Sequence, residues 1–158
     1  MRFFDCRTLD YFHFIFGHFL TNRSYETIQF GDATSNTDRL GILIAWLVNH
    51  QLTDANFENE NAKAISRLRL EDMTGPEFFT TVLHGEFGSA FLNHLGQDFV
   101  EEYFLGGTYD YDYNQVKSGV ADERLLSDHV SQRISKAYRK YVEPPSLAKK
   151  LAKVLRFR

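Results

Sequence analysis

The chain has 158 residues, enough for one domain with a core of its own and too few for two ordinary domains. Its 18 Lys and Arg and 21 Asp and Glu give a net charge of -3, so the molecule as a whole lacks the basic field of a nucleic-acid-binding protein. Cys6 is the only cysteine, which excludes an internal disulfide and gives no sign of an oxidising compartment. We therefore expect a cytoplasmic protein.

The first predicted helix runs from about Thr8 to Leu20 and is rich in aromatic residues. One of its faces gathers apolar side chains at helical spacing, namely Leu9, Phe12, Phe16 and Phe19. Its apolar run is shorter than the roughly 20 residues that span a bilayer, and two histidines interrupt it. It also lacks the small-residue cleavage site of a secretory signal. We expect a core helix here.

The second predicted helix, about Thr37 to His50, is apolar on nearly every face. Asn36 or Thr37 is placed to cap its first turn, because both residue types accept hydrogen bonds from the free N–H groups there. A helix that is apolar all round is usually buried, so we expect this one at the centre of the fold. Trp46, the only tryptophan, is expected in the core.

Two helices are predicted after this central one. The first runs from about Asn59 to Leu70 and has an apolar face with basic residues near its end. The second begins in the segment "TGPEFFTTVLHG", where Thr74 and Glu77 have the spacing of a capping box and Gly85 is placed to end the helix. This spacing indicates that Thr74 and Glu77 have a structural role.

Two further helices are predicted, from about Asn93 to Leu105 and from about Ala121 to Val142. Two prolines stop the second, and a short basic amphipathic helix follows. No convincing strand pair is found. We therefore predict an all-α fold, a single-domain bundle of about six to seven helices around the central helix Thr37 to His50. Within it, residues 121–158 supply the long helix and the basic tail.

The stretch Gly106 to Val116, "GGTYDYDYNQV", looks at first like a metal loop. The first three ligand positions of an EF-hand are matched by Asp110, Asp112 and Asn114. That loop also needs a glycine at its sixth position and a glutamate at its twelfth, which here are Gln115 and Ala121. We expect no calcium site. The glycines predict that the stretch is a connection rather than part of a helix.

Catalytic signatures are missing from the sequence. The six histidines lie on different predicted helices, and no two have the spacing that presents a pair of zinc ligands. There is no nucleophile elbow, phosphate loop or dinucleotide-binding motif. Glu101 and Glu102 are adjacent, so on a helix they diverge by about 100° and do not converge as a catalytic pair. We predict no enzyme activity, no catalytic residue, no metal and no cofactor.

Four segments between Leu40 and Val116 carry a family resemblance. In chain order they are "RLGILIAWLVNHQL", "MTGPEFFTTVLHGEF", "LNHLGQDFVEEYF" and "TYDYDYNQV". They resemble a family of small, mostly uncharacterised bacterial proteins that share segments of the type "HIGMFLAW", "ITGxEFL" and "LNxxGxxFxxxYY", followed by a Tyr/Asp-rich segment. Arg39 stands where this family usually has histidine. The resemblance implies an all-helical protein without established catalytic residues.

Members of this kind tend to occur near secreted bacterial toxins, in the manner of immunity proteins. The resemblance therefore implies a non-enzymatic cytoplasmic binding protein whose partner is a cognate antibacterial toxin, with no nucleic acid or membrane as partner. An inhibitor of a basic toxin gains association rate and selectivity from an acidic surface with aromatic anchors. The candidate partner-binding residues are Glu101, Glu102, Tyr109, Asp110, Tyr111 and Asp112.

Alternatives remain open at this point. The alternating Tyr and Asp residues would also suit packing, with one tyrosine face buried and the aspartates in water. The basic tail would suit a nucleic-acid or anionic-surface module, through Lys149, Lys150, Lys153, Arg156 and Arg158. A small hydrolase would need a site assembled from scattered polar residues. The aromatic excess fits self-association as well as a partner site, so a homodimer is also left open.

Overall fold

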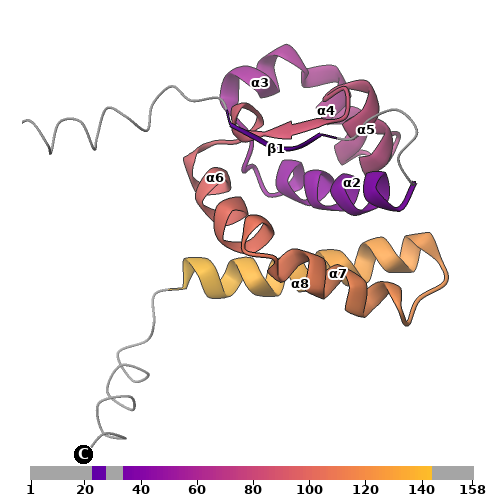
Figure 1. Ribbon diagram of the computed structural model, residues 1–158. Helices are drawn as coiled ribbons and strands as arrows, with labels where there is room; N and C mark the ends of the chain where they lie inside the picture. Colours follow the sequence, from indigo (N-terminus) through magenta and orange to yellow (C-terminus); the bar gives the residue numbers. More distant parts are fainter. Residues whose placement is uncertain (1–22, 28–33, 144–158) are drawn as a thin grey trace, which may run out of the picture.

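A computed structural model describes residues 23–27 and 34–143, and the described chain is mostly helical (Figure 1). In chain order the elements are β1 (Ser24–Thr27), α2 (Thr34–Asn49), α3 (Ala55–Glu60), α4 (Ala62–Arg69), α5 (Gly75–Thr81), β2 (Glu86–Gly88), the 3-10 turn η1 (Ser89–Phe91), α6 (His94–Val100), the π-helical turn η2 (Glu101–Leu105), α7 (Thr108–Lys117) and α8 (Glu123–Val142). The predicted all-α bundle is confirmed. The predicted helix Thr8 to Leu20 and the helix of the basic tail lie outside the described residues.

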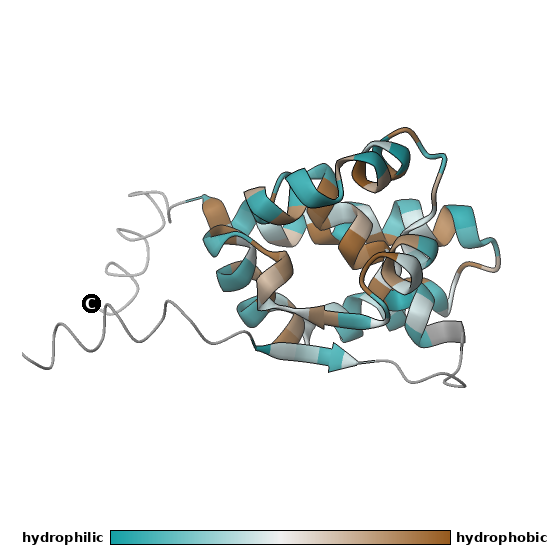
Figure 2. Cartoon of the chain, turned by 90° about the horizontal axis from the view of Figure 1, so that it is seen from above, coloured by the Kyte–Doolittle hydropathy of each residue, from teal (hydrophilic) through white to brown (hydrophobic). Residues whose placement is uncertain are grey.

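Helix α2 forms the centre of the bundle, as predicted. Its side chains without accessible surface are Leu40, Leu43, Ile44, Leu47 and Val48, and it packs against α4, α5 and α8. Trp46 is buried and donates its indole N–H to the hydroxyl of Ser135 in α8 at 2.9 Å. Figure 2 shows the hydrophobic residues of the helices gathered in the interior of the described chain. The core therefore lies where α2 meets its neighbours.

The start of α2 differs from the prediction. The helix begins at Thr34, so Asn36 and Thr37 lie inside its first turn instead of capping it. Ser, Thr and Asn suit either the cap or the turn beside it, and composition alone therefore does not fix a helix start to the residue.

Helices α2 and α5 approach each other most closely at two glycines. A Cβ atom on Gly41 would lie 2.4 Å from the backbone nitrogen of Pro76, and one on Gly75 would lie 2.2 Å from the carbonyl oxygen of Gly41. Both distances are far below van der Waals contact, so neither position accommodates a side chain in this packing. Two of the segments that carry the family resemblance thus meet backbone to backbone.

The predicted capping box is confirmed at the start of α5. The backbone N–H of Glu77 donates to the Thr74 hydroxyl at 3.3 Å, and the N–H of Thr74 donates to the Glu77 carboxylate at 2.8 Å. The Thr74 N–H and, at 3.0 Å, the Thr74 hydroxyl donate to the Glu77 carboxylate, and these two bonds hold the pKa of Glu77 below its ordinary value. Gly85 lies beyond the end of the helix with φ 78°, where it turns the chain toward β2.

The predicted helix from Asn59 to Leu70 is two helices. Helix α3 begins earlier, because the Asp54 carboxylate caps it by accepting from the N–H groups of Asn56 and Phe57 at 2.9 and 3.2 Å. The chain then leaves helical geometry at Asn61, with φ -113° and ψ 20°, before α4 begins. The apolar face that was predicted from the spacing is formed by Ile65 and Leu68, which are both buried.

A short antiparallel sheet was not predicted. Strands β1 and β2 pair with Glu26 opposite Phe87 and Thr27 opposite Glu86. Strands of four and three residues are too short to show the alternation that identifies a strand in a sequence. The Tyr25 ring packs edge-on against Phe87 with centroids 5.5 Å apart, so the sheet joins the core and fixes the position of Glu26.

The last three helices form the side of the molecule that carries the candidate site. Asn93 caps α6 through the N–H of Gly96 at 2.9 Å, and Asp122 caps α8. Both predicted helices here, Asn93 to Leu105 and Ala121 to Val142, agree with the observed elements within two residues. Helix α8 packs along α7 and against α2. Within the described ranges, every helix is too short or too polar to cross a bilayer.

Candidate functional site

The stretch Gly106 to Val116 contains helix α7, which corrects the prediction that it is a connection. Gly107, with φ 77°, is the turn between the end of η2 and a new helix that begins at the next residue. Tyr109 and Tyr113 are four residues apart and buried, whereas Tyr111 is 64% exposed. Although Tyr and Asp alternate along the sequence, the buried tyrosines are four residues apart, which is the spacing of one helix face.

Tyr109 is a core residue. Its side chain has no accessible surface, and its hydroxyl donates to the backbone carbonyl of Arg39 in α2 at 2.5 Å. Burial raises the pKa of this hydroxyl well above its ordinary value, so it stays a neutral donor. Because the ring reaches no solvent, we leave Tyr109 out of the candidate partner-binding surface.

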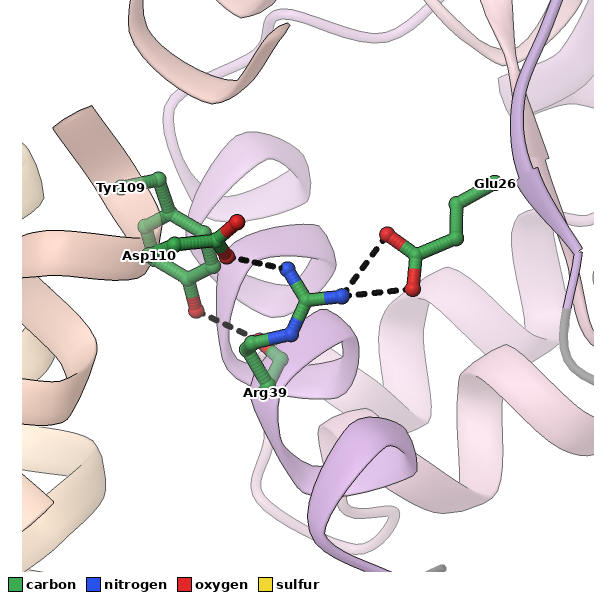
Figure 3. Close-up of polar contacts among 4 residues, drawn as sticks. All are labelled: Glu26, Arg39, Tyr109 and Asp110. Atoms are coloured by element: carbon green, nitrogen blue, oxygen red, sulfur yellow. Dashed lines mark hydrogen bonds and ion pairs between the residues drawn. The ribbon is translucent and has the colours of Figure 1, made fainter. Parts of the chain in front are cut away.

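Arg39 joins three elements through its side chain (Figure 3). The guanidinium donates to both carboxylate oxygens of Glu26 in β1, at 2.5 and 2.7 Å, and to Asp110 in α7 at 2.5 Å. It also lies over the ring of Phe104, 5.5 Å from the centroid. Burial alone would lower the pKa of Arg39, but the hydrogen bond and charge of Glu26, with the charge of Asp110, raise it. The charged Arg39 side chain therefore links β1 and α7 to α2.

The sequence alone did not predict the interaction of Arg39 with Glu26 and Asp110. Arg39 and Glu26 are 13 residues apart, in a helix and in a strand that was not predicted, so no local spacing rule pairs them. The one signal available was the departure from the family pattern at Arg39. Asp110 was selected as a docking residue, and the structure gives its carboxylate a partner inside the chain.

Asp112 connects α7 to η2 and to α8. Its carboxylate accepts from the Tyr103 hydroxyl of η2 at 2.9 Å and lies 3.6 Å from the Arg133 guanidinium of α8. Burial, and then the hydrogen bond and charge of Asp112, raise the pKa of Tyr103. The side chain of Asp112 is mostly covered, so this carboxylate positions helices and offers little surface to a partner.

The exposed side of α6 and η2 is acidic and partly apolar. Glu101 and Glu102 both lie on it, and Glu101 is paired with Arg23 at 3.0 Å. Two leucines on the same segment are exposed, Leu95 by 42% and Leu105 by 47%. The backbone of η2 is π-helical, a rare conformation that is frequent at functional sites. Of the six candidate residues, four are exposed, namely Glu101, Glu102, Asp110 and Tyr111. Asp110 is paired with the mostly buried Arg39 and Glu101 with the exposed Arg23, so we keep Glu101, Glu102 and Tyr111 as the candidates for partner binding.

A groove of about 390 Å³ lies between η2, α7 and α8. One side is formed by Glu102, Tyr111 and Asp112, and the α8 side by Arg133, Lys136 and Lys140. Phe99, Tyr103 and Tyr141 complete much of the remaining lining. Three of the candidate residues, on two elements, therefore border one hollow whose other side is basic.

Residues 23–27 and 34–143 contain no cluster of three or more His, Cys, Asp or Glu side chains that could hold a metal ion. The two aspartates that matched the EF-hand pattern lie on a helix. One is paired with Arg39 and the other accepts from Tyr103.

The fold and the site define a small α-helical protein with an acidic, partly aromatic surface beside a groove. The model of a family described as a domain of unknown function, DUF7832, matches residues 18–141, and the chain belongs to this family. Comparison with curated proteins and with solved structures finds no match. The uncharacterised family expected from the sequence is therefore confirmed, over a longer part of the chain than the four segments cover.

Proposed function

We propose that the chain is a non-enzymatic cytoplasmic binding protein of bacterial origin that neutralises a cognate antibacterial toxin, as an immunity protein does. The observation that carries the proposal is the docking face, which we define as Leu95, Glu101, Glu102, Leu105 and Tyr111. It combines exposed apolar side chains with carboxylates over one continuous helical segment and the start of α7.

The composition of the docking face suits a basic protein partner. Tyr111 presents a largely exposed ring, and tyrosine is one of the residues that most often dominate binding energy when an interface covers it. Glu101 and Glu102 are charges at the rim, which increase the association rate with a positively charged partner more than they increase the affinity. The face therefore supplies both an anchor and electrostatic steering.

Helices around the docking face are joined by hydrogen bonds and ion pairs. Asp112 ties η2 to α7 and α8, and Arg39 ties α7 to α2 and β1. A preorganised surface loses less conformational entropy when a partner binds, so the interactions within the chain support the docking role without being part of it.

The binding test uses charge reversal with a matched control. Glu101→Lys combined with Glu102→Lys should weaken binding to the purified toxin by lowering the association rate, and the loss should diminish at high salt. Glu60→Lys combined with Glu71→Lys makes the same change of net charge at two exposed positions outside the docking face. Equal losses from both double variants, measured by stopped-flow or surface plasmon resonance, would contradict the assignment of the docking face.

A further inference from the structure

The basic side of the groove belongs to a helix with an uneven charge distribution. Between Asp128 and Glu143, α8 carries four cations and no Asp or Glu. Three of them, Arg133, Lys136 and Lys140, line the groove, and we call these three the cationic row. Their spacing of three and four residues places them on one face of the helix, along about 10 Å of its axis.

Two members of the cationic row have no ion pair within the described part of the chain. Lys136 and Lys140 lack a carboxylate within 4.0 Å there, and Arg133 reaches Asp112 only at 3.6 Å. Glu102 borders the same groove without an ion pair to any described residue. Glu102, Lys136 and Lys140 thus border a common hollow without an ion pair to a described residue, whereas Arg133 is paired with Asp112 in the same lining.

Aromatic rings supply the remaining chemistry of the groove. Tyr111 and Tyr141 are partly open to solvent, and Phe99 packs against Tyr141 with ring centroids 5.6 Å apart. Burial, and then the charges of Asp98 and Glu102, raise the pKa of Tyr141, so its hydroxyl is neutral. The groove thus offers flat apolar surface between a hydrogen-bond acceptor and a row of cations.

We propose that this groove binds a nucleoside phosphate. Phosphate oxygens would pair with the cationic row, a planar base would stack on Tyr111 or Tyr141, and a ribose hydroxyl or base amino group would donate to Glu102. The volume of about 390 Å³ lies in the range of small-molecule sites. A bare anion satisfies only the basic side and is repelled by Glu102, so a ligand with both a donor and a phosphate fits better.

This proposal does not rest on the toxin-binding proposal, because its phosphate contacts come from α8, although Glu102 and Tyr111 belong both to the docking face and to the groove. The test uses the full chain and ADP without added metal, followed by isothermal titration calorimetry and backbone NMR shifts. ADP should bind and perturb residues of α8 and α7 around the groove, and raising the salt concentration should weaken it. Adenosine and inorganic phosphate should each bind at least about tenfold more weakly than ADP, since each offers only part of the complementary groups.

Variants locate the site. Lys136→Ala combined with Lys140→Ala should weaken ADP binding about tenfold or more, because each removes a charged hydrogen-bond partner. Arg139→Ala removes a cation of the same helix that does not line the groove and should leave binding unchanged; because it removes one charge, it is the control for Lys136→Ala and Lys140→Ala made singly. The proposal is overturned if ADP does not bind at millimolar concentration, if phosphate alone binds as well as ADP, or if Arg139→Ala costs as much as the double variant. Binding of a single-stranded oligonucleotide without binding of ADP would also overturn it.

Discussion

Replacing Tyr109 with alanine should destabilise the fold far more than the same change at Tyr111, two residues away. Tyr109 has no accessible surface, whereas Tyr111 is 64% exposed. A buried tyrosine covers about 150–250 Å², which at about 25 cal/mol per Å² gives an upper estimate of about 4–6 kcal/mol. Truncations of large core aromatics typically cost about 3–5 kcal/mol, so we expect Tyr109→Ala to fall in that range and Tyr111→Ala to cost about 1 kcal/mol or less.

Urea denaturation followed by circular dichroism measures both values. The midpoint should fall strongly for the Tyr109 variant with an unchanged m-value, and only slightly for the Tyr111 variant. Tyr109→Phe isolates the hydroxyl, whose hydrogen bond to the Arg39 carbonyl should contribute about 0.5–1.5 kcal/mol. If Tyr111→Ala destabilises the protein as much as Tyr109→Ala, the inward register of α7 is wrong.

Four other substitutions test the Arg39 interactions, the capping box and the contact between α2 and α5. In urea titrations, Arg39→Met should lower the free energy of unfolding by about 1.5–3 kcal/mol and Asp110→Ala by less than about 1 kcal/mol. The reason is that the Arg39 side chain is 12% exposed and that of Asp110 is 52% exposed. Equal losses would contradict the role of Arg39 in linking β1, α2 and α7. Thr74→Ala should cost about 1 kcal/mol at neutral pH. The fold lowers the pKa of Glu77, so the stability that its carboxylate contributes is present above the unfolded pKa and disappears as the pH falls through the folded one. Thr74→Ala removes the hydroxyl that donates to this carboxylate, so the part of its stability loss that comes from this bond should disappear in acid, while the part from the bond of the Glu77 N–H to the hydroxyl remains. A loss that does not change with pH would show that the bond from the hydroxyl to the carboxylate adds no stability. Gly41→Ala should cost about 1–3 kcal/mol or more in thermal denaturation, since the backbone of α5 blocks a Cβ there, and a neutral result would refute the close helix approach.

Much of the fold could be predicted because its signals are local. The apolar run of α2 follows from burial of nearly the whole helix, the 3.6-residue spacing in α6 and α8 follows from burial of one helix face, and the capping box follows from the free N–H groups at a helix start. These features depend on residues within a few positions of one another. The helices that carry them were therefore predicted with nearly the observed bounds.

The tie at Arg39 and the sheet could not be predicted for the opposite reason. Glu26, Arg39 and Asp110 come together only after β1, α2 and α7 have packed, and each pair is far apart in the chain. The two strands are stabilised by their pairing and by the packing of Tyr25. A strand of four residues is too short to show the two-residue alternation of apolar and polar side chains by which a strand is predicted. In α7 the alternation of residue types hid the helical period.

The segments behind the family resemblance have mainly structural roles. Gly41 and Gly75 allow the close contact between α2 and α5, Thr74 caps α5, and Tyr109 and Tyr113 are buried in the core. The resemblance therefore identified residues that maintain the fold. The exposed members of the docking face, such as Tyr111, are the better places to look for a partner.

The most direct test of the proposed function is the survival of cells that express the protein encoded next to this gene, with and without this chain. The account predicts that the neighbouring product alone stops growth, that co-expression of the chain restores it, and that Glu101→Lys combined with Glu102→Lys restores it poorly despite normal folding. If cells die equally with and without a stably folded, co-expressed chain, the account of this protein as an immunity protein is contradicted.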